Sequence, residues 1–151
     1  MPKRCGRSAV PFVHTTPVRF AHVDAAGIVF YPRFFEMLNA AVEDWFAALG
    51  RDFRSLHLGD RIGTPTVRLE ADFVAPAMLG DVLAIALTPV RVGTSSCTYR
   101  FAFESGGTLR LKGEGVLVCM DLDAQRSRPW PDAIGAALRA GLASDLDNGV
   151  A

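Results

Sequence analysis

The chain has 151 residues, of which 50% are hydrophobic and 21% are charged, and its 16 Lys and Arg residues balance its 16 Asp and Glu residues. A chain of this length can bury one core but not two, so the composition predicts a single globular domain. The balanced charge argues against a surface that wraps nucleic acid, because such surfaces usually show a basic excess. No apolar run approaches the roughly 20 residues that a membrane-spanning helix needs.

We expect one domain over residues 12–143, with flexible tails over residues 1–11 and 144–151. The basic N-terminus is not followed by the apolar stretch of a secretory signal. The three cysteines are widely spaced and form no CxxC or Cys/His pattern, which indicates neither a disulfide framework nor a structural zinc site. These features predict a cytoplasmic protein in which Cys97 and Cys119 are buried thiols.

The first predicted elements are a strand and a long helix. Residues 12–20 have the composition of a strand, and residues 21–27 form a loop. From Pro32 to Leu49 apolar residues recur every three or four positions, which predicts a helix lying on a core. Proline suits the first helical position, and Gly50 suits the end of the helix.

After a polar stretch the spacing of apolar residues changes to two, which is typical of half-buried strands. Gly106 and Gly107 mark a hairpin turn between the last two strands. Gly113 and Gly115, inside the last strand, indicate a bend or a close approach of another group. The predicted strands cover residues 67–73, 82–92, 97–104 and 109–121, and a closing helix covers residues 131–142.

One long helix followed by consecutive strands is typical of an α+β fold, in which a curved antiparallel sheet wraps around the helix. Counting the first strand, we expect about five strands. The pattern leaves the order of the strands across the sheet open.

The segment from His22 to Pro32 contains the most informative chemistry. Asp24 lies in a loop that leads into the start of the long helix, where unpaired N–H groups carry partial positive charge. A carboxylate beside such donors makes a minimal site for acyl transfer, and the apolar residues 28–30 are expected to form a dry wall around it. The alternative is that Asp24 only caps a turn and that residues 28–30 are ordinary core.

Motifs for other chemistries are missing from the sequence. It contains no GxSxG nucleophile motif, no phosphate-binding P-loop and no GxGxxG fingerprint. The spacing of His14, His22 and His57 does not match a metal site. We therefore expect neither a metal nor a resident cofactor.

The segment Val18–Met37, with its continuation through Ala40 and Val42–Trp45, resembles the active-site signature of hotdog-fold acyl-CoA thioesterases of the 4-hydroxybenzoyl-CoA thioesterase type. The order of the predicted elements is also similar to a hotdog fold. The resemblance implies an acyl-CoA or aryl-CoA thioesterase whose only ligand is its substrate. It also implies a homodimer or homotetramer with the site at the subunit interface.

The resemblance assigns roles to several residues of the loop and helix start. Asp24 matches the catalytic carboxylate, and the backbone N–H of Tyr31 matches the group that binds the thioester oxygen. The remaining expected substrate-binding residues are Gly27, Ile28, Val29, Phe30 and His57, and Phe73, Tyr99 and Phe101 are further candidates for the acyl pocket.

The chain departs from the family pattern at three places. Ala25 stands where the family often has proline, and His22 stands where it often has an acidic residue. The basic cluster that some relatives use for the CoA phosphates is missing at residues 93–96. Arg91, Arg126 and Arg128 are candidate substitutes.

A thioester needs little catalytic machinery, because its thiolate leaving group has a conjugate acid with a pKa near ~8.5 and departs without a strong acid. Asp24 would attack the carbonyl or deprotonate the attacking water, and the sequence leaves both routes open. Two other functions are alternatives. One is a hotdog dehydratase or hydratase that pairs His22 with Asp24, and the other is an acyl-CoA-binding protein without catalysis.

Overall fold

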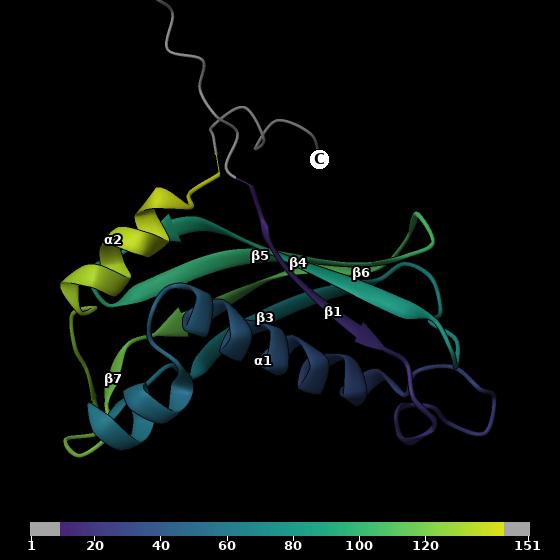
Figure 1. Ribbon diagram of the computed structural model, residues 1–151, viewed down its shortest axis with the longest axis horizontal. Helices are drawn as coiled ribbons and strands as arrows, with labels where there is room; N and C mark the ends of the chain where they lie inside the picture. Colours follow the sequence, from purple (N-terminus) through teal and green to yellow (C-terminus); the bar gives the residue numbers. More distant parts are fainter. Residues whose placement is uncertain (1–9, 144–151) are drawn as a thin grey trace, which may run out of the picture.

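The computed structural model describes residues 10–143, so the predicted tails fall almost entirely outside the described residues. Helix α1 (Tyr31–Ala48) lies along one face of a curved five-stranded sheet, and a short helix, α2 (Asp132–Ala140), packs near one end (Figure 1). This arrangement confirms the predicted α+β class. None of the helices in the described part of the chain is long and apolar enough to cross a membrane.

The sheet is antiparallel throughout, and its strand order is β1-β4-β5-β6-β3. The consecutive strands β4, β5 and β6 form its centre, while β1 and β3 each pair on one side only. The predicted number of five strands is confirmed. The strands are β1 (Phe12–Pro17), β3 (Thr66–Phe73), β4 (Val82–Val92), β5 (Ser96–Ser105) and β6 (Thr108–Val118).

Helix α1 begins one residue before the predicted start, which makes Pro32 its second residue. It ends just before Gly50, whose φ of +102° favours glycine. Its apolar stripe faces the sheet as the periodicity predicts. The buried side chains on this face are Phe34, Met37, Leu38, Ala41, Val42, Trp45 and Phe46.

The two glycines of β6 allow large aromatic rings of β5 to lie flat across the sheet. A Cβ atom at Gly115 would lie 2.7 Å from the ring of Tyr99, and one at Gly113 would lie 2.6 Å from Phe101 Cζ. Tyr99 and Phe101 are 1% exposed and contact each other at a ring-centroid distance of 6.2 Å. Of the two interpretations of these glycines, a close approach is therefore confirmed.

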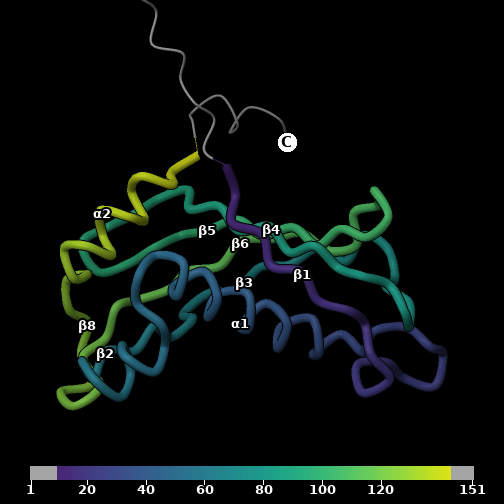
Figure 2. Tube along the Cα trace, in the orientation of Figure 1, coloured from purple at the N-terminus to yellow at the C-terminus, as the bar shows by residue number. Residues whose placement is uncertain are grey.

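A helical turn follows the end of α1 and lies beside a small second sheet, and neither the turn nor this sheet was predicted. The turn η2 (Arg54–Gly59) lies beside this sheet at the C-terminal end of α1 (Figure 2). The polar stretch after α1, for which the sequence predicted no element, is therefore structured. The three short strands are β2 (Ile62–Gly63), β7 (Met120–Asp121) and β8 (Arg126–Ser127).

Cys97 and Cys119 are fully buried free thiols, as predicted. Burial raises the pKa of Cys97 from 9.0 to about 12 and also raises that of Cys119. Both thiols therefore stay protonated near neutral pH.

Candidate active site

Asp24 lies in a tight loop of residues 23–29, the Asp24 loop, whose first and last residues form an antiparallel bridge. The Ala26 N–H donates a hydrogen bond to Asp24 Oδ1 at 2.8 Å, and the Gly27 N–H donates one to the Asp24 carbonyl at 3.0 Å. Gly27 has a φ of +76°, which favours glycine. Asp24 Oδ2 makes no hydrogen bond or ion pair with other residues of the described chain. The turn therefore fixes one carboxylate oxygen and leaves the other available.

The N-terminus of α1 presents an unused hydrogen-bond donor. Phe30 precedes the helix with an extended backbone, and its N–H donates to the His22 carbonyl at 2.9 Å. Pro32 has no N–H, and the Arg33 N–H donates to the Phe30 carbonyl at 2.8 Å. Between residues 10 and 143, the Tyr31 N–H has no acceptor. This group is therefore free to bind an oxygen atom with negative charge.

Residues 74–81 form a second loop that holds the Asp24 loop in place. The Val29 N–H donates to the Ala77 carbonyl at 2.8 Å, and the Leu79 N–H donates to the Gly27 carbonyl at 3.0 Å. These bonds come from a segment distant in sequence, so sequence patterns gave no signal for them. They tie the position of Asp24 to the end of strand β3.

The predicted dry wall is only partly formed. Val29 is buried in the core and Ile28 is half-buried, but the side chain of Phe30 is 48% exposed. Asp24 is itself exposed in the single chain. Phe30 caps the helix at the surface, where the same chain supplies no cover, so its place in the dry wall stays a prediction.

Five aromatic side chains gather between the start of α1 and strand β3, and we call them the aromatic cluster. Phe73, at the end of β3, lies 6.1 to 6.3 Å from the ring centroids of three aromatic residues on α1. Phe73 and Tyr31 are 54% and 60% exposed. The cluster, which comprises Phe30, Tyr31, Phe34, Phe35 and Phe73, leads from the helix N-terminus to the open edge of the sheet.

His22 is engaged in a turn of its own. Its Nδ1 accepts a hydrogen bond from the Arg19 N–H at 2.8 Å, which stabilises the 3-10 turn η1 (Phe20–His22). No hydrogen bond joins His22 to Asp24 in the described residues. The structure therefore gives no support to the His22–Asp24 pair that the dehydratase alternative requires.

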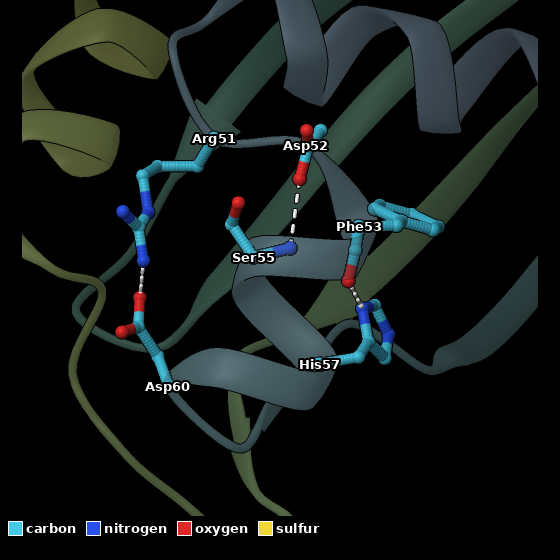
Figure 3. Close-up of polar contacts among 6 residues, drawn as sticks. All are labelled: Arg51, Asp52, Phe53, Ser55, His57 and Asp60. Atoms are coloured by element: carbon cyan, nitrogen blue, oxygen red, sulfur yellow. Dashed lines mark hydrogen bonds and ion pairs between the residues drawn. The ribbon is translucent and has the colours of Figure 1, made fainter.

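His57 lies on η2, which follows the C-terminal end of α1, whereas Asp24 precedes the N-terminal end of this helix. Figure 1 shows the segments before and after α1 at opposite ends of the helix. Its ring packs on Phe53 at 4.6 Å and its Nδ1 lies 2.9 Å from the Phe53 carbonyl oxygen (Figure 3). The 18 residues of α1 span about 27 Å. Within one chain, the structure does not bring His57 to the other predicted site residues.

The contacts around His57 stabilise the turn itself. The Ser55 N–H donates to Asp52 Oδ1 at 2.7 Å, and Arg51 pairs with Asp60 across the turn (Figure 3). The hydrogen bonds from Ser55 lower the pKa of Asp52. Of the candidate arginines for the CoA phosphates, Arg91 lies at the C-terminal end of β4, Arg126 lies on β8, and Arg128 directly follows β8.

A groove of about 210 Å³ runs between α1 and strand β3, and we call it the α1–β3 groove. Of the predicted pocket residues, Tyr99 lines this groove, Phe73 belongs to the aromatic cluster, and Phe101 lies in the core. Asn39 and Thr66 also line the groove, but neither was predicted from the sequence. The position of Asn39, a polar residue beside the apolar stripe of α1, could have indicated a role in a groove. The groove is lined by Phe35, Leu38, Asn39, Val42, Thr66, Leu69 and Tyr99.

Comparison with known proteins identifies the family. The family model described as the thioesterase-like superfamily matches residues 18–138. A relative from Thermosynechococcus vestitus, named 1,4-dihydroxy-2-naphthoyl-CoA hydrolase, is 30% identical over 82% of this chain and 85% of the relative. The family model covers the Asp24 loop, α1 and strands β3, β4, β5 and β6 of the sheet.

Solved structures agree with this result. The crystal structure of a thioesterase superfamily protein from Jannaschia has a TM-score of 0.82 and 27% identity, over 95% of this chain and 99% of that chain. The structure of BH1999, a gentisyl-coenzyme A thioesterase, has a TM-score of 0.75 and 26% identity, over 83% of this chain and 98% of that chain. The hotdog fold that the resemblance implies is confirmed. With a family model matching most of its length, the chain belongs to the thioesterase-like superfamily.

Proposed function

We propose that this protein hydrolyses the thioester bond of an acyl-CoA, and that the acyl group is aromatic. The observation that carries the proposal is a free carboxylate oxygen, Asp24 Oδ2, in the loop that leads to the unpaired N–H of Tyr31 at the start of α1. The hydrogen bond from the Phe30 N–H to the His22 carbonyl joins the two ends of this loop. The names of the relatives, a dihydroxynaphthoyl-CoA hydrolase and a gentisyl-CoA thioesterase, support an aromatic substrate. CoA enters the reaction as part of the substrate.

The proposed mechanism follows from these two groups. The Tyr31 N–H donates a hydrogen bond to the thioester carbonyl oxygen and stabilises the negative charge that develops there. In one route, Asp24 Oδ2 attacks the carbonyl carbon, the carbon–sulfur bond breaks, and water then hydrolyses the mixed anhydride. In the other route, Asp24 takes a proton from water as the water attacks the same carbon. Both routes release the carboxylic acid and the CoA thiol.

The substitution Asp24→Asn tests this proposal without rebuilding the loop. The Asn side-chain oxygen can still accept the hydrogen bond from Ala26, so the turn is expected to persist. An amide neither attacks the carbonyl as a carboxylate does nor accepts a proton from water. We expect kcat to fall at least ~10²-fold with an unchanged circular dichroism spectrum. The measurement is thiol release from a panel of aromatic and aliphatic acyl-CoAs.

Three results separate the alternatives. Near-normal turnover by the Asp24→Asn variant would remove Asp24 from the mechanism. Loss or gain of unsaturation without thiol release would identify a hydratase or dehydratase. Tight acyl-CoA binding without any turnover by the natural protein would identify a binding protein.

We also propose that the protein works as a homo-oligomer whose site is completed at the subunit interface. Strand β3 pairs on one side only, and Val67, Leu69 and Phe73 on this strand are 60%, 38% and 54% exposed. An open strand edge with exposed apolar side chains favours pairing with another chain. The aromatic cluster is continuous with this edge, so a second copy paired there would cover the open side of the Asp24 site.

A further inference from the structure

His22 joins the turn η1 to the loop that carries Asp24, and it does so with its side chain as well as its backbone. Its ring nitrogen Nδ1 accepts a hydrogen bond from the Arg19 N–H at 2.8 Å, and its own backbone N–H donates to the Arg19 carbonyl at 2.9 Å. A nitrogen that accepts an N–H carries no proton, so the ring is neutral and its single N–H is at Nε2. The turn therefore holds this imidazole in its uncharged form.

The backbone of His22 also sets the position of the helix start. The Phe30 N–H donates to the His22 carbonyl at 2.9 Å, and Phe30 directly precedes Tyr31, the first residue of α1. Asp24 follows His22 by two residues, in the loop that the bridge between residues 23 and 29 closes. A shift of the His22 backbone therefore moves the Asp24 carboxylate and the Tyr31 N–H relative to each other.

Charged side chains lie on the elements joined to this turn, but within residues 10–143 none of them forms an ion pair or hydrogen bond with the His22 ring. These charged residues are Arg19, Asp24, Arg33, Glu36, Asp81 and Arg110. Arg33 pairs with Glu36 at 2.8 Å, and Arg110 Nη2 lies 3.8 Å from Asp81 Oδ2. The ring therefore has no ion-pair partner in the described chain that would compensate for losing the hydrogen bond from Arg19.

We propose that His22 is a positioning residue for thioester hydrolysis, and that only its neutral ring holds the Asp24 carboxylate and the Tyr31 N–H in their working arrangement. The inference rests on the proposed function. In acid the imidazole takes a second proton, and a ring with two N–H groups cannot accept the Arg19 N–H. Histidine ordinarily changes charge between about pH 5 and 8, whereas carboxyl groups do so at about pH 4. Activity should therefore fall as the pH drops through the histidine range.

The first test compares His22→Asn with the natural protein at pH 8.0 and pH 5.5. In asparagine Oδ1 is bonded to the same carbon, Cγ, as Nδ1 in histidine, so it can accept the Arg19 N–H, but it does not titrate. Both proteins should have a similar kcat at pH 8.0. Between pH 8.0 and 5.5, kcat should fall about three- to tenfold more in the natural protein, the size expected for one lost hydrogen bond. KM should change less, and thiol release from the fastest acyl-CoA of the panel measures both constants.

Two further variants separate this role from a general effect of acid. His22→Ala has no acceptor and should show the reduced kcat already at pH 8.0. His14→Asn is the matched control, because His14 lies on β1 and pairs with Asp44 on α1 at 2.6 Å, and no hydrogen bond within residues 10–143 joins its side chain to the Asp24 loop. This variant should keep the pH dependence of the natural protein.

NMR gives a readout that does not depend on activity. Two-dimensional ¹H–¹⁵N spectra of the full chain follow the backbone amide signals of Arg19 and Tyr31 as the pH is lowered from 8.0 to 5.5. In the natural protein we expect both signals to move with the protonation of the His22 ring. The Arg19 amide loses its acceptor, and the Tyr31 amide responds because the helix start shifts. In His22→Asn both signals should stay in place.

Two outcomes on activity would overturn the inference. One is an equal fall of kcat with pH in the natural protein and in His22→Asn, and the other is a loss of the pH dependence in His14→Asn alone. If no thioester releases thiol, the proposed function fails, and the NMR titration then decides the inference separately. Joint movement of the two amide signals with the His22 ring would support it, and a Tyr31 signal that does not respond would overturn it.

Discussion

Asp24 illustrates how one residue combines a structural role with a proposed chemical one. Aspartate before glycine often caps a turn, and here Oδ1 does accept the Ala26 N–H. The capping role does not exclude the chemical one, because a carboxylate has two oxygens. The turn instead restricts the side chain and reduces the entropy lost when Oδ2 meets a substrate.

Cys97 gives a prediction about stability at alkaline pH. Its pKa is raised from 9.0 to about 12 by burial, so the unfolded chain loses this proton at lower pH than the folded chain. The contribution to stability is therefore complete below pH 9 and is lost as the pH rises toward 12. The free energy of unfolding should fall by up to about 1.4 kcal/mol per pH unit from this group. Urea unfolding at pH 8, 9 and 10 measures the slope.

Cys97→Ala is the comparison for this experiment, because it removes the titrating group from a fully buried site. Its unfolding free energy should decline less steeply between pH 9 and 10 than that of the natural protein. The slope that remains belongs to Cys119 and Tyr99, whose pKa values are also raised by burial. Identical slopes for both proteins would show that the Cys97 thiolate is not destabilising.

At the scale of elements, Arg110 on β6 connects the sheet to the loop that holds the Asp24 loop. Its backbone carbonyl accepts hydrogen bonds from Val74 and Ala75, and its Nη1 donates to the Pro76 carbonyl at 2.8 Å. Its Nη2 also lies 3.8 Å from a carboxylate oxygen of Asp81. The backbone and side chain of this one residue thus contact both ends of residues 74–81.

Arg110→Gln should therefore loosen this loop and, through it, Asp24. We expect a stability loss of about 0.5–1.5 kcal/mol, since the hydrogen bond to the Pro76 carbonyl and the ion pair with the partly exposed Asp81 are lost. We also expect a several-fold lower kcat, with KM less affected. Lys112→Gln is the control, because Lys112 is exposed on the same strand and should change neither value. An unchanged kcat in Arg110→Gln would show that the loop does not position Asp24.

At the scale of the whole molecule, the uneven cover of the sheet predicts how copies associate. Helix α1 covers the centre of the sheet but leaves β3 open, and β1 forms the other edge. Val67 on β3 is 60% exposed, and Val13 on β1 is 50% exposed. The same substitution at these two valines therefore compares the two edges of the sheet.

We expect Val67→Lys to weaken self-association by at least about tenfold in Kd, because it places a charge on the proposed apolar interface. Val13→Lys should leave association unchanged. Light scattering across a dilution series measures both, and thiol release on the same samples tests whether activity falls with dissociation. A natural protein that is fully active as a monomer would contradict the proposed assembly.

Much of the fold was predictable, because periodicity reports which face of an element is buried. The stripe of α1 and the alternation in β4 and β5 depend only on neighbouring residues, and the structure confirms them. The turn η2 and the strands β2 and β8 were missed, and residues 120–121, predicted as the end of the last strand, form the separate strand β7. These elements are short and depend on contacts such as the one between Arg51 and Asp60 rather than on a repeating pattern.

The sequence by itself determined the α+β class, the helix start and the loop carrying Asp24, because each depends on residues close together in the chain. The tertiary structure decided the strand order, the placement of His57 far from that loop, and the groove that joins Asn39, Thr66 and Tyr99. Packing over long sequence distances sets these features. A local pattern contains no record of which distant residues will meet.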